Sequence, residues 1–427
     1  MARFLKALAP AIVAAALIGC GSSNNNSGPV SLRFVNASTN QSLTVSLNGT
    51  VQFSTIAAGA STSYSQVAAG TYTITISSAS GALASASLSA GLGSNSTFTL
   101  VGYTRNGAIV AYLVTEDQTV PVGGLGTIGV ANISPDAGAL DVYLVTPGTT
   151  SLSGLTPQFP FANFAAVPVF TTLVAGTFDV VATASGNPND VRLRLPSVQV
   201  AAGQVRLVAF TNTPGGALVN AVILNQAGTV GAATVQYVNN TQARVRIASA
   251  LPTAGLTPVA GTVGSQALAT VYSPNPGSYT EVAGNTSTYT ISANGAAVAG
   301  LPAATFAVGG DYTILVYGAA ATPTVAVFTD NNQVPAGGNA NLRLINAGAN
   351  ISQGLTMYYN NVQVANSILY GQASAYFGVA QSALATLQLI APGMNPVSAT
   401  VSLNSPGAVY TVFVIDSTLT PYLIRDR

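Results

Sequence analysis

Leu32-Arg33-Phe34-Val35-Asn36 is the first of four similar stretches in this 427-residue chain, each a short run of β-forming residues that closes on an apolar residue and Asn. The other three are Ile128-Gly129-Val130-Ala131-Asn132, Val235-Gln236-Tyr237-Val238-Asn239 and Leu342-Arg343-Leu344-Ile345-Asn346. Their spacing of about 100 residues is the length of a small domain, and a fixed spacing of this kind indicates tandem copies of one unit. We expect the four Asn residues to mark the point at which the first strand of each copy ends and the chain turns.

The strands that follow alternate between apolar and polar residues, which is typical of β-structure buried on one face. In the first copy, Leu43-Thr44-Val45-Ser46-Leu47 alternates in this way and leads into Asn48-Gly49, a strong hairpin signal because both residues tolerate positive φ. No stretch has the periodicity and length of a helix. Each copy offers about seven or eight short strands between Gly, Pro or Asn turns. The sequence therefore predicts an all-β fold, a tandem array of four immunoglobulin-like antiparallel β-sandwich domains.

The domain boundaries follow from the repeat. We place the four sandwiches at residues 31–121, 127–229, 234–335 and 341–427. The joints between them are short and rich in small residues, as at 122–126 and 335–339. Such joints predict a string of domains with limited hinge freedom.

Residues 1–19 have the features of an export signal. Arg3 and Lys6 supply a positive start, and the apolar run 7–18 is shorter than the roughly 20 residues that a spanning helix needs. Leu17-Ile18-Gly19-Cys20 resembles the bacterial lipobox, in which the Cys is acylated by palmitate or a related chain and cleavage occurs just before it. A plain secretory signal with a chance Cys is the alternative. Cys20 is the only Cys in the chain, which favours lipidation.

A lipid anchor at Cys20 predicts where the protein sits. Residues 20–30 would form the lipidated start and a flexible tether of Gly, Ser and Asn. Gly21 rather than Asp after the Cys favours the outer membrane in such lipoproteins. We therefore expect a protein attached to the cell outer membrane through its lipid, on either face. The mature chain would lack both thiol and amine side chains, because Lys6 is the only Lys.

The second copy resembles a known family. Val130-Ala131-Asn132-Ile133-Ser134-Pro135-Asp136-Ala137-Gly138-Ala139-Leu140-Asp141-Val142-Tyr143 is similar to the signature of the bacterial domain of unknown function 4397 family. That signature is a strand ending in His-Ala-Ser-Pro-Asp-Ala that leads to a strand Val-Asp-Val-Tyr. Here Asn132 stands in place of the usual His. The resemblance is good over 127–229, fair over the first and fourth copies and weak over the third. It implies a bacterial lipoprotein with tandem domains of this family, and an architecture more than an activity.

Composition excludes several classes of chemistry. Charged residues are 5% of the chain, against roughly 25% in typical soluble domains. The net charge is +1 with no basic run, which argues against nucleic-acid binding. There is no His, the commonest general base and metal ligand. Paired carboxylates are the remaining catalytic device. We therefore predict a protein that is not an enzyme and uses no cofactor, with a carboxylate-dependent hydrolase as a remote alternative.

The eleven acidic residues offer few candidate sites. Asp136 and Asp141 form a weak candidate site for a hard ion such as Ca²⁺, since carboxylates and loop carbonyls suit such ions. We favour a turn start for Asp136 and a solvent-facing strand start for Asp141. Glu116-Asp117 and Asp330 end strands, and we interpret them as solvated strand ends.

Two Arg pairs place positive side chains two residues apart, and therefore on one face of a strand. They are Arg192 with Arg194 and Arg244 with Arg246. A small patch for an anionic ligand is one interpretation. We favour the other, in which these charges lie on exposed strands and discourage edge-to-edge pairing.

The repeated Asn residues fit a structural role. An Asn side chain can hydrogen-bond the backbone two residues on and tolerates left-handed geometry, so we expect a turn-stabilising role in all four copies. The sequence as a whole favours a non-enzymatic cell-envelope lipoprotein that acts as a structural, spacer or adhesion/binding module. The alternative is a binding protein for an envelope polysaccharide or a protein partner.

Overall fold

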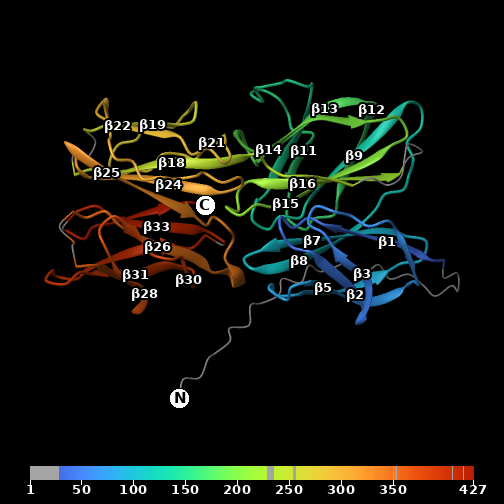
Figure 1. The fold of residues 1–427 in the computed structure, drawn as a ribbon, viewed down its shortest axis with the longest axis horizontal. Coiled ribbons are helices and arrows are strands. Elements are labelled where there is room, and N and C mark those ends of the chain that lie inside the picture. Colours follow the sequence, from blue (N-terminus) through green and yellow to red (C-terminus); the bar gives the residue numbers. More distant parts are fainter. Residues whose placement is uncertain are drawn as a thin grey trace, which may run out of the picture. The chain divides into compact units, whose positions relative to one another are not determined.

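The computed structural model describes residues 28–227, 235–252, 256–349, 351, 353–405, 407–416 and 418–427. The expected signal peptide, Cys20 and all but the last residues of the expected tether lie outside this range. Within it the chain is built of strands, shown in Figure 1, and its one helical element is the 3₁₀ turn η1 (Ala336–Gly338). No helix in the described ranges has the length and apolar composition that crossing a membrane requires.

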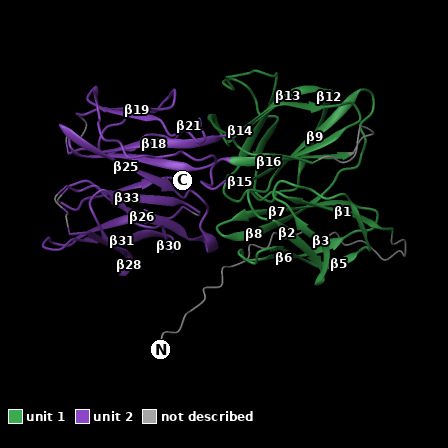
Figure 2. Ribbon diagram, in the orientation of Figure 1, with its two compact units in different colours: residues 1–212, 219–240 green, residues 213–218, 241–427 purple. Residues whose placement is uncertain are grey.

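The described chain forms two compact units, coloured separately in Figure 2. Unit 1 runs to Asn212 and takes in Val219–Asn240, and unit 2 comprises Thr213–Leu218 and Thr241–Arg427. Each unit holds two β-sandwiches, which we number 1 to 4 along the chain. The predicted all-β class and its tandem sandwiches are confirmed.

Sandwich 1 packs a sheet of order β4-β1-β7-β8 against one of order β3-β2-β5-β6. Its strands are β1 (Val30–Asn36), β2 (Leu43–Leu47), β3 (Thr50–Ile56), β4 (Ser65–Val67), β5 (Gly70–Ser78), β6 (Ala86–Leu92), β7 (Thr97–Arg105) and β8 (Ala108–Thr115). The predicted hairpin is β2–β3, turning at Asn48 and Gly49 with φ of 48° and 82°. Leu32 and Phe34 of β1 meet Val45 of β2 in the core between the two sheets.

Sandwich 2 combines the sheets β12-β9-β15-β16-β17 and β11-β10-β13-β14. Its strands are β9 (Leu125–Asn132), β10 (Leu140–Val145), β11 (Phe159–Ala162), β12 (Val169–Val174), β13 (Gly176–Ala184), β14 (Asn187–Val200), β15 (Val205–Asn212), β16 (Val219–Ala227) and β17 (Val235–Val238). The stretch expected to open the third sandwich is β17, and it pairs with β16 instead. Asn240 fixes it there by donating from Nδ2 to the Val219 carbonyl at 3.0 Å. The boundary expected at residue 234 therefore lies after Asn240.

Sandwich 3 begins at the next strand and has the sheets β21-β18-β24-β25 and β20-β19-β22-β23. Its strands are β18 (Gln242–Ala250), β19 (Val259–Val263), β20 (Gln266–Ala267), β21 (Thr280–Ala283), β22 (Tyr289–Ala293), β23 (Ala296–Ala297), β24 (Asp311–Ala319) and β25 (Thr322–Asp330). Phe306 fills its core and meets Tyr289 and Tyr312 edge to face.

Sandwich 4 has the sheets β29-β26-β33-β34, with β30 also on β26, and β28-β27-β31-β32. Its strands are β26 (Ala340–Asn346), β27 (Leu355–Tyr359), β28 (Val362–Ile368), β29 (Gln372–Ala373), β30 (Phe377–Val379), β31 (Ser382–Ile390), β32 (Val397–Leu403), β33 (Val409–Val414) and β34 (Pro421–Arg425). The core between the two sheets includes Leu342, Met357 and Val412.

Each sandwich departs from the antiparallel prediction at one strand pair. The first strand runs parallel to a later one in four pairs: β1 with β7, β9 with β15, β18 with β24, and β26 with β33. These strands are buried on both faces along most of their length, as parallel strands usually are. A second layer must therefore cover the outer face of each sheet that contains such a pair.

The covering layer is the neighbouring sandwich of the same unit. Val35 and Val101 of sandwich 1 join Leu207 and Val222 of sandwich 2 in one buried cluster. A second cluster joins sandwiches 3 and 4 in the same way. Each unit is thus a stack of four sheets with three cores (Figure 1). Within each unit, this finding corrects the expected string of domains with limited hinge freedom, because each sandwich buries one outer face on its neighbour. We call these outer faces the paired faces.

Four outer strands are interrupted by a bulge. The register shifts on β3, β11, β14 and β28, and each carries a non-Gly residue at positive φ: Thr55, Phe161, Ser197 and Ser367. In every case a neighbouring side chain accepts the hydrogen of that residue's amide: Thr44, Asp141, Asp179 and Thr356. A bulged edge resists pairing with another chain. The fold thus protects these edges by backbone shape where charge is scarce.

Candidate functional site

Charged side chains gather on the paired faces. In three of the four sandwiches the same four residue types meet there: an Arg, a Thr, an acidic residue and a Tyr. We call each set a tetrad. The three tetrads are Arg33, Thr99, Glu116 and Tyr64; Arg246, Thr313, Asp330 and Tyr279; and Arg343, Thr411, Asp426 and Tyr376.

Strand pairing explains how residues far apart in sequence form a tetrad. Parallel register puts the Arg of the first strand directly beside the Thr of its neighbour, as with Arg33 and Thr99. The acidic residue lies two positions beyond the antiparallel partner of that Thr, as Glu116 lies beyond Val114. The Tyr comes immediately before the edge strand that pairs on the other side of the Arg. Each tetrad therefore spans four adjacent strands.

In sandwich 1 the tetrad is closed within one sandwich. Arg33 is fully buried, and its Nη2 lies 3.0 Å from Glu116 Oε1. Its Nε donates to Thr99 Oγ1 at 2.7 Å, and its guanidinium lies 4.7 Å from the ring centre of Tyr64. The Tyr64 hydroxyl donates to Glu116 Oε2 at 2.7 Å. A further bond leaves the tetrad, from Arg33 Nη2 to the Asn225 carbonyl of sandwich 2 at 3.1 Å.

In unit 2 the two tetrads exchange their ion pairs. Arg246 of sandwich 3 binds Asp426 of sandwich 4 at 2.5 Å, and Arg343 of sandwich 4 binds Asp330 of sandwich 3 at 2.5 Å. Each carboxylate also accepts a hydroxyl from its own sandwich, Thr411 for Asp426 and Thr313 for Asp330, both at 2.5 Å. The contact is reciprocal, as in the interface of a two-fold symmetric dimer.

The electrostatics of unit 2 hold these groups in fixed ionisation states. Burial opposes ionisation of Asp330, but the guanidinium groups of Arg343 and Arg246 outweigh it, so the pKa of Asp330 is lowered. Burial and the Asp330 charge together raise the pKa of Tyr279 well above its usual value. The carboxylate therefore stays charged and the phenol stays protonated, donating to Asp330 Oδ2 at 2.6 Å.

Sandwich 2 carries an uncharged version of the same site. At the four tetrad positions it has Gly129, Leu207, Gln226 and Phe170. The ring of Phe170 lies over Gly129, where an added Cβ would meet it at 2.4 Å. Phe170 thus takes the space that the Arg and Tyr share in the other sandwiches.

Several predictions about charged residues are corrected by these contacts. Arg244 and Arg246 were expected on an exposed strand, but both are buried on the interior strand β18, where Arg244 binds Asp311 at 2.6 Å. Glu116 and Asp330 were interpreted as solvated strand ends, and they are buried tetrad acids. Burial of a charge is costly unless it is paired, and the pairing across strands supplies the compensation.

The other Arg pair lies on an edge strand, as expected, but its side chains are half-buried and not exposed. Arg192 and Arg194 are on β14, which is an edge strand. Arg192 forms a 2.8 Å ion pair with Asp190, and Arg194 donates to the Thr149 carbonyl at 2.7 Å.

The two candidate metal ligands do not face one another. Asp136 is fully buried and forms a two-point ion pair with Arg105 of sandwich 1, at 2.8 and 2.7 Å, and it also accepts from Asn212. Asp141, expected on a solvent face, is buried and accepts the backbone amides of Phe161 and Gly186 at 2.9 and 2.8 Å. Within the described ranges no group of acidic, His or Cys residues could hold a metal ion. Asp136 thus joins sandwich 2 to sandwich 1, and Asp141 supports the bulge on β11.

Three of the four repeated Asn residues have the same contacts. Asn132 is buried, donates from Nδ2 to the Gly138 and Ala162 carbonyls at 2.7 and 3.0 Å, and accepts the Ser134 amide at 3.1 Å. The corresponding bonds are made by Asn36 to Gln41, Ile56 and Ser38, and by Asn346 to Ile351, Ile368 and Gly348. These bonds join the end of the first strand to the turn that follows it. They also join it to the last residue of an edge strand in the facing sheet: β3, β11 or β28.

Asn239 is the exception. It is exposed just after β17 and does not end the first strand of a sandwich. Ser249 of β18 takes the place of the repeated Asn in sandwich 3, three residues after Arg246 as Asn36 follows Arg33. Its hydroxyl is buried and has no hydrogen-bond partner among the described residues. The sequence match at Asn239 was therefore a local likeness without the shared structural position.

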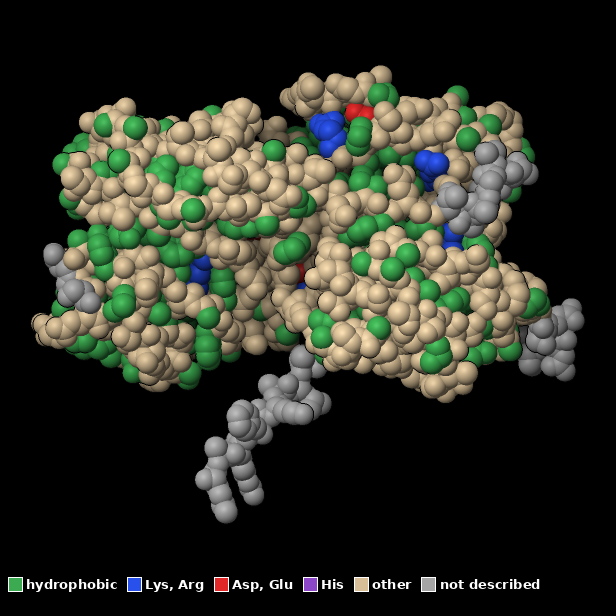
Figure 3. All heavy atoms as spheres, in the orientation of Figure 1, with side chains coloured by type: hydrophobic (Ala, Val, Ile, Leu, Met, Phe, Trp, Pro, Cys, Tyr) green, Lys and Arg blue, Asp and Glu red, His purple; other side chains and the backbone are tan. Residues whose placement is uncertain are grey.

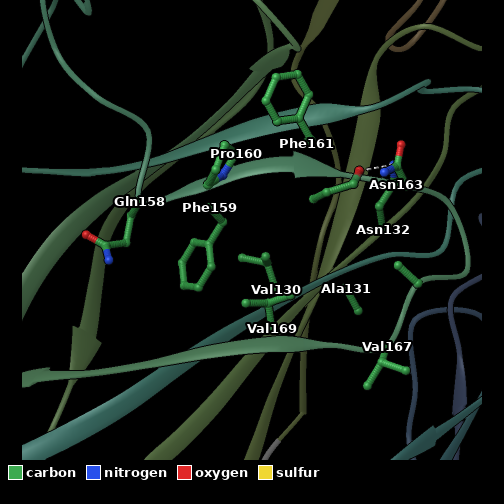
Figure 4. Close-up of a pocket in the computed structure, with 12 residues that line it drawn as sticks. Val130, Ala131, Asn132, Gln158, Phe159, Pro160, Phe161, Asn163, Val167 and Val169 are labelled. Carbon is green, nitrogen blue, oxygen red and sulfur yellow. Dashed lines mark hydrogen bonds between the residues drawn. The ribbon is translucent and has the colours of Figure 1, made fainter.

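A small cavity of about 100 Å³ opens at one side of sandwich 2, between β9, β11 and β12. Figure 4 shows Phe159, Phe161 and Val169 around it, and its lining contains no charged side chain. Phe161, Val167 and Val169 on its rim are 65%, 65% and 56% exposed. The volume suits one apolar side chain or ring and no larger ligand.

Comparison with known protein families identifies the first part of the chain. Residues 30–143 match the model of the family Domain of unknown function (DUF4397). The DUF4397 match covers sandwich 1 and continues through β9 and most of β10, ending at Tyr143, the last residue of the signature segment. The expected resemblance to this family is confirmed, although we expected the best match over 127–229.

Other comparisons add little. The curated proteins contain no match. Among solved structures, the Bacillus anthracis TIE protein is 10% identical, with a TM-score of 0.14, over 87% of this chain and 65% of that one. This chain therefore spans less than two thirds of the length of that protein. So low a TM-score carries no structural inference.

The tetrads were missed because their members are scattered singly through the sequence. One signal could have found them. Residues 98–103 and 312–317 each contain one Thr among otherwise apolar or Gly residues, which indicates strands buried on both faces. A charged residue on a strand that pairs with such a run must be buried, so Arg33 and Arg246 could have been assigned to ion pairs.

Proposed function

We propose that this chain is a non-enzymatic lipoprotein of the cell envelope, attached to the outer membrane through acylated Cys20, whose sandwiches act as a structural, spacer or adhesion module. The observation that carries this proposal is the position of the acidic side chains. Six of the eleven acidic residues are buried, and they bind Arg, backbone amides or hydroxyls within the fold.

Two further observations support a structural role. Sandwiches that share buried faces move as one body, which suits a spacer or scaffold. A carboxylate-dependent hydrolase needs two carboxyl groups facing a cleft, whereas the cavity of sandwich 2 is lined by apolar and amide side chains. Figure 3 shows few acidic side chains on the face in view.

The anchor is tested by a Cys20→Ser variant of the full-length chain. We expect it to leave the membrane fraction and to fail to incorporate labelled palmitate, while a Ser22→Ala control stays in the membrane fraction and is labelled. A Cys20→Ser protein that still fractionates with the outer membrane would show that the anchor assignment is wrong. Proximity labelling from the full-length protein in the native cell would then identify its envelope neighbours.

The second candidate function is a binding protein for an envelope polysaccharide or a protein partner. One observation favours it: Phe161 is exposed at a left-handed φ of 53°, where the corresponding bulges of sandwiches 1 and 4 have Thr55 and Ser367. Strained backbone that presents an aromatic ring is typical of binding sites. Phe161→Ser, which copies the Ser of sandwich 4, should abolish retention on envelope polysaccharide without changing the thermal stability. Unchanged retention would contradict this second candidate.

A further inference from the structure

In unit 2 the paired face of each sandwich is complementary to the paired face of the other sandwich, and also to a second copy of itself. Sandwich 3 presents Arg246 and Asp330, and sandwich 4 presents Arg343 and Asp426 at the corresponding positions of the same strands. Each Arg binds the acid of the other sandwich, at 2.5 Å in both cases. An interface in which each side offers the same donor and acceptor is isologous, so either face would also fit a copy of itself.

The tetrad positions of unit 1 offer no such match, and the ion pair that joins its two sandwiches, Arg105 with Asp136, lies outside them. Sandwich 2 has neither charge, since Gly129 and Gln226 stand in place of the Arg and the acid. Sandwich 1 has both charges, but Arg33 and Glu116 already bind each other at 3.0 Å within that sandwich. Sandwich 3 or 4 placed against sandwich 2 would therefore bury its Arg and its acid away from the opposite charges that they bind in unit 2, which is unfavourable.

We propose that the tetrads form a pairing code that decides which sandwich docks on which. A face whose Arg and acid bind across the interface, and not each other, accepts only another face of the same kind. That face belongs either to the neighbouring sandwich in the chain or to the same sandwich in a second copy of this protein. A face whose tetrad positions are neutral, or neutralised within its own sandwich, accepts another face of that kind. Four similar sandwiches in one chain carry a risk of wrong docking during folding, and this code suppresses it.

The code concerns specificity more than stability. Replacing a complete buried ion pair by neutral residues of similar volume is often neutral or stabilising. Unit 1 shows that a largely apolar face also packs well, because Leu207 and Val222 are fully buried against sandwich 1. The charges of unit 2 are therefore retained for the choice of partner.

Two double variants of the full-length chain test the code with the same substitution types and the same net charge. R246M/D426N removes one complete pair and leaves Arg343 with Asp330. R246M/D330N leaves Arg343 and Asp426, both on sandwich 4, where each has lost the partner that it binds across the interface. The face of sandwich 4 in a second copy offers both partners again.

The assay is refolding from guanidinium followed by size-exclusion chromatography with light scattering, over a range of protein concentrations. We expect R246M/D426N to refold as a monomer like the wild type. We expect R246M/D330N to form a dimer at least about tenfold more readily, a discrimination of about 1.4 kcal/mol. Equal association of the two variants would overturn the proposal. D190N/R192M, which removes an ion pair on β14 away from the paired faces, is the control and should stay monomeric.

A neutral face provides an independent test if R246M/D330N fails to fold. In R246M/D330N/R343M/D426N no charge of the code remains. We expect a denaturation midpoint at or above that of the wild type, but a refolded mixture of monomers and dimers, at least about tenfold richer in dimers than the wild type. A quadruple variant that refolds as cleanly to monomer as the wild type would show that the charges do not select the partner.

Discussion

Replacing Arg33 by Met should destabilise unit 1 far more than the loss of an exposed ion pair. Arg33 is fully buried and neutralises Glu116, whose side chain is also fully buried. Met fills part of the same space, but the carboxylate keeps only neutral donors, the hydroxyls of Thr99 and Tyr64 and the amide of Gln118. Removing one partner of a buried ion pair costs about 3–5 kcal/mol, against about 0–1 kcal/mol at the surface.

Thermal unfolding of the full-length chain measures this loss. The chain has 17 Tyr and no Trp, so far-ultraviolet circular dichroism and Tyr fluorescence are the suitable signals. At about 2–4 °C per kcal/mol for a unit of this size, the transition of unit 1 should fall by roughly 6–20 °C. The transition of unit 2 should stay where it is, which provides an internal reference.

The double variant R33M/E116Q separates charge from packing. It removes both members of the pair and leaves a neutral acceptor for the Tyr64 hydroxyl, as Gln226 leaves sandwich 2 neutral. We expect it to recover most of the stability that Arg33→Met loses. A loss below about 1 kcal/mol in the single variant, or a double variant no more stable than the single, would refute the description of this tetrad as a buried, charge-compensated site.

Three further predictions address other features. The pKa of Asp330 is lowered in the folded state, so the stability that it contributes is present above its unfolded pKa and is lost as pH falls below about 4. The urea midpoint of unit 2 should therefore drop between pH 5 and pH 2, and it should drop less in D330N. Asn132→Ala removes the two hydrogen bonds that this buried Asn donates to part-buried carbonyls and should cost roughly 1–3 kcal/mol in urea unfolding. The exposed Asn239→Ala should stay within about 0.5 kcal/mol, and equal losses would contradict the assignment. Gly129→Ala places a Cβ 2.4 Å from the Phe170 ring and should cost about 1–3 kcal/mol, and G129A/F170L should restore the thermal midpoint if the ring is the obstacle.

The sandwiches could be predicted because their strands obey local rules. Alternation at Leu43–Leu47 and the Asn48-Gly49 turn specify a hairpin within a dozen residues, without reference to the rest of the chain. The repeat of Asn36, Asn132 and Asn346 likewise reflects one local set of bonds between a strand end and its turn.

The paired faces could not be predicted in this way, because they depend on contacts between distant strands. Arg33 meets Thr99 through a parallel pairing, and Arg246 meets Asp426 across 180 residues. Because the sequence has few charged residues, we expected their side chains at the surface, whereas each Arg of the tetrads is buried. The prediction that Asn239 ends the first strand of the third sandwich was wrong for a related reason. Its stretch forms a strand of the expected composition, but that strand pairs with the preceding sandwich.

The exchanged ion pairs of unit 2 also restrict how a gene of this kind can change in length. Recombination that deleted sandwich 4 alone would leave Arg246 and Asp330 on a bare face without the partners that they bind there, Asp426 and Arg343. A single added sandwich whose tetrad pairs across the interface would likewise bring an unmatched face. Gain or loss of two sandwiches together keeps every buried charge matched. Selection should therefore preserve even numbers of sandwiches, so that the heritable module is the pair.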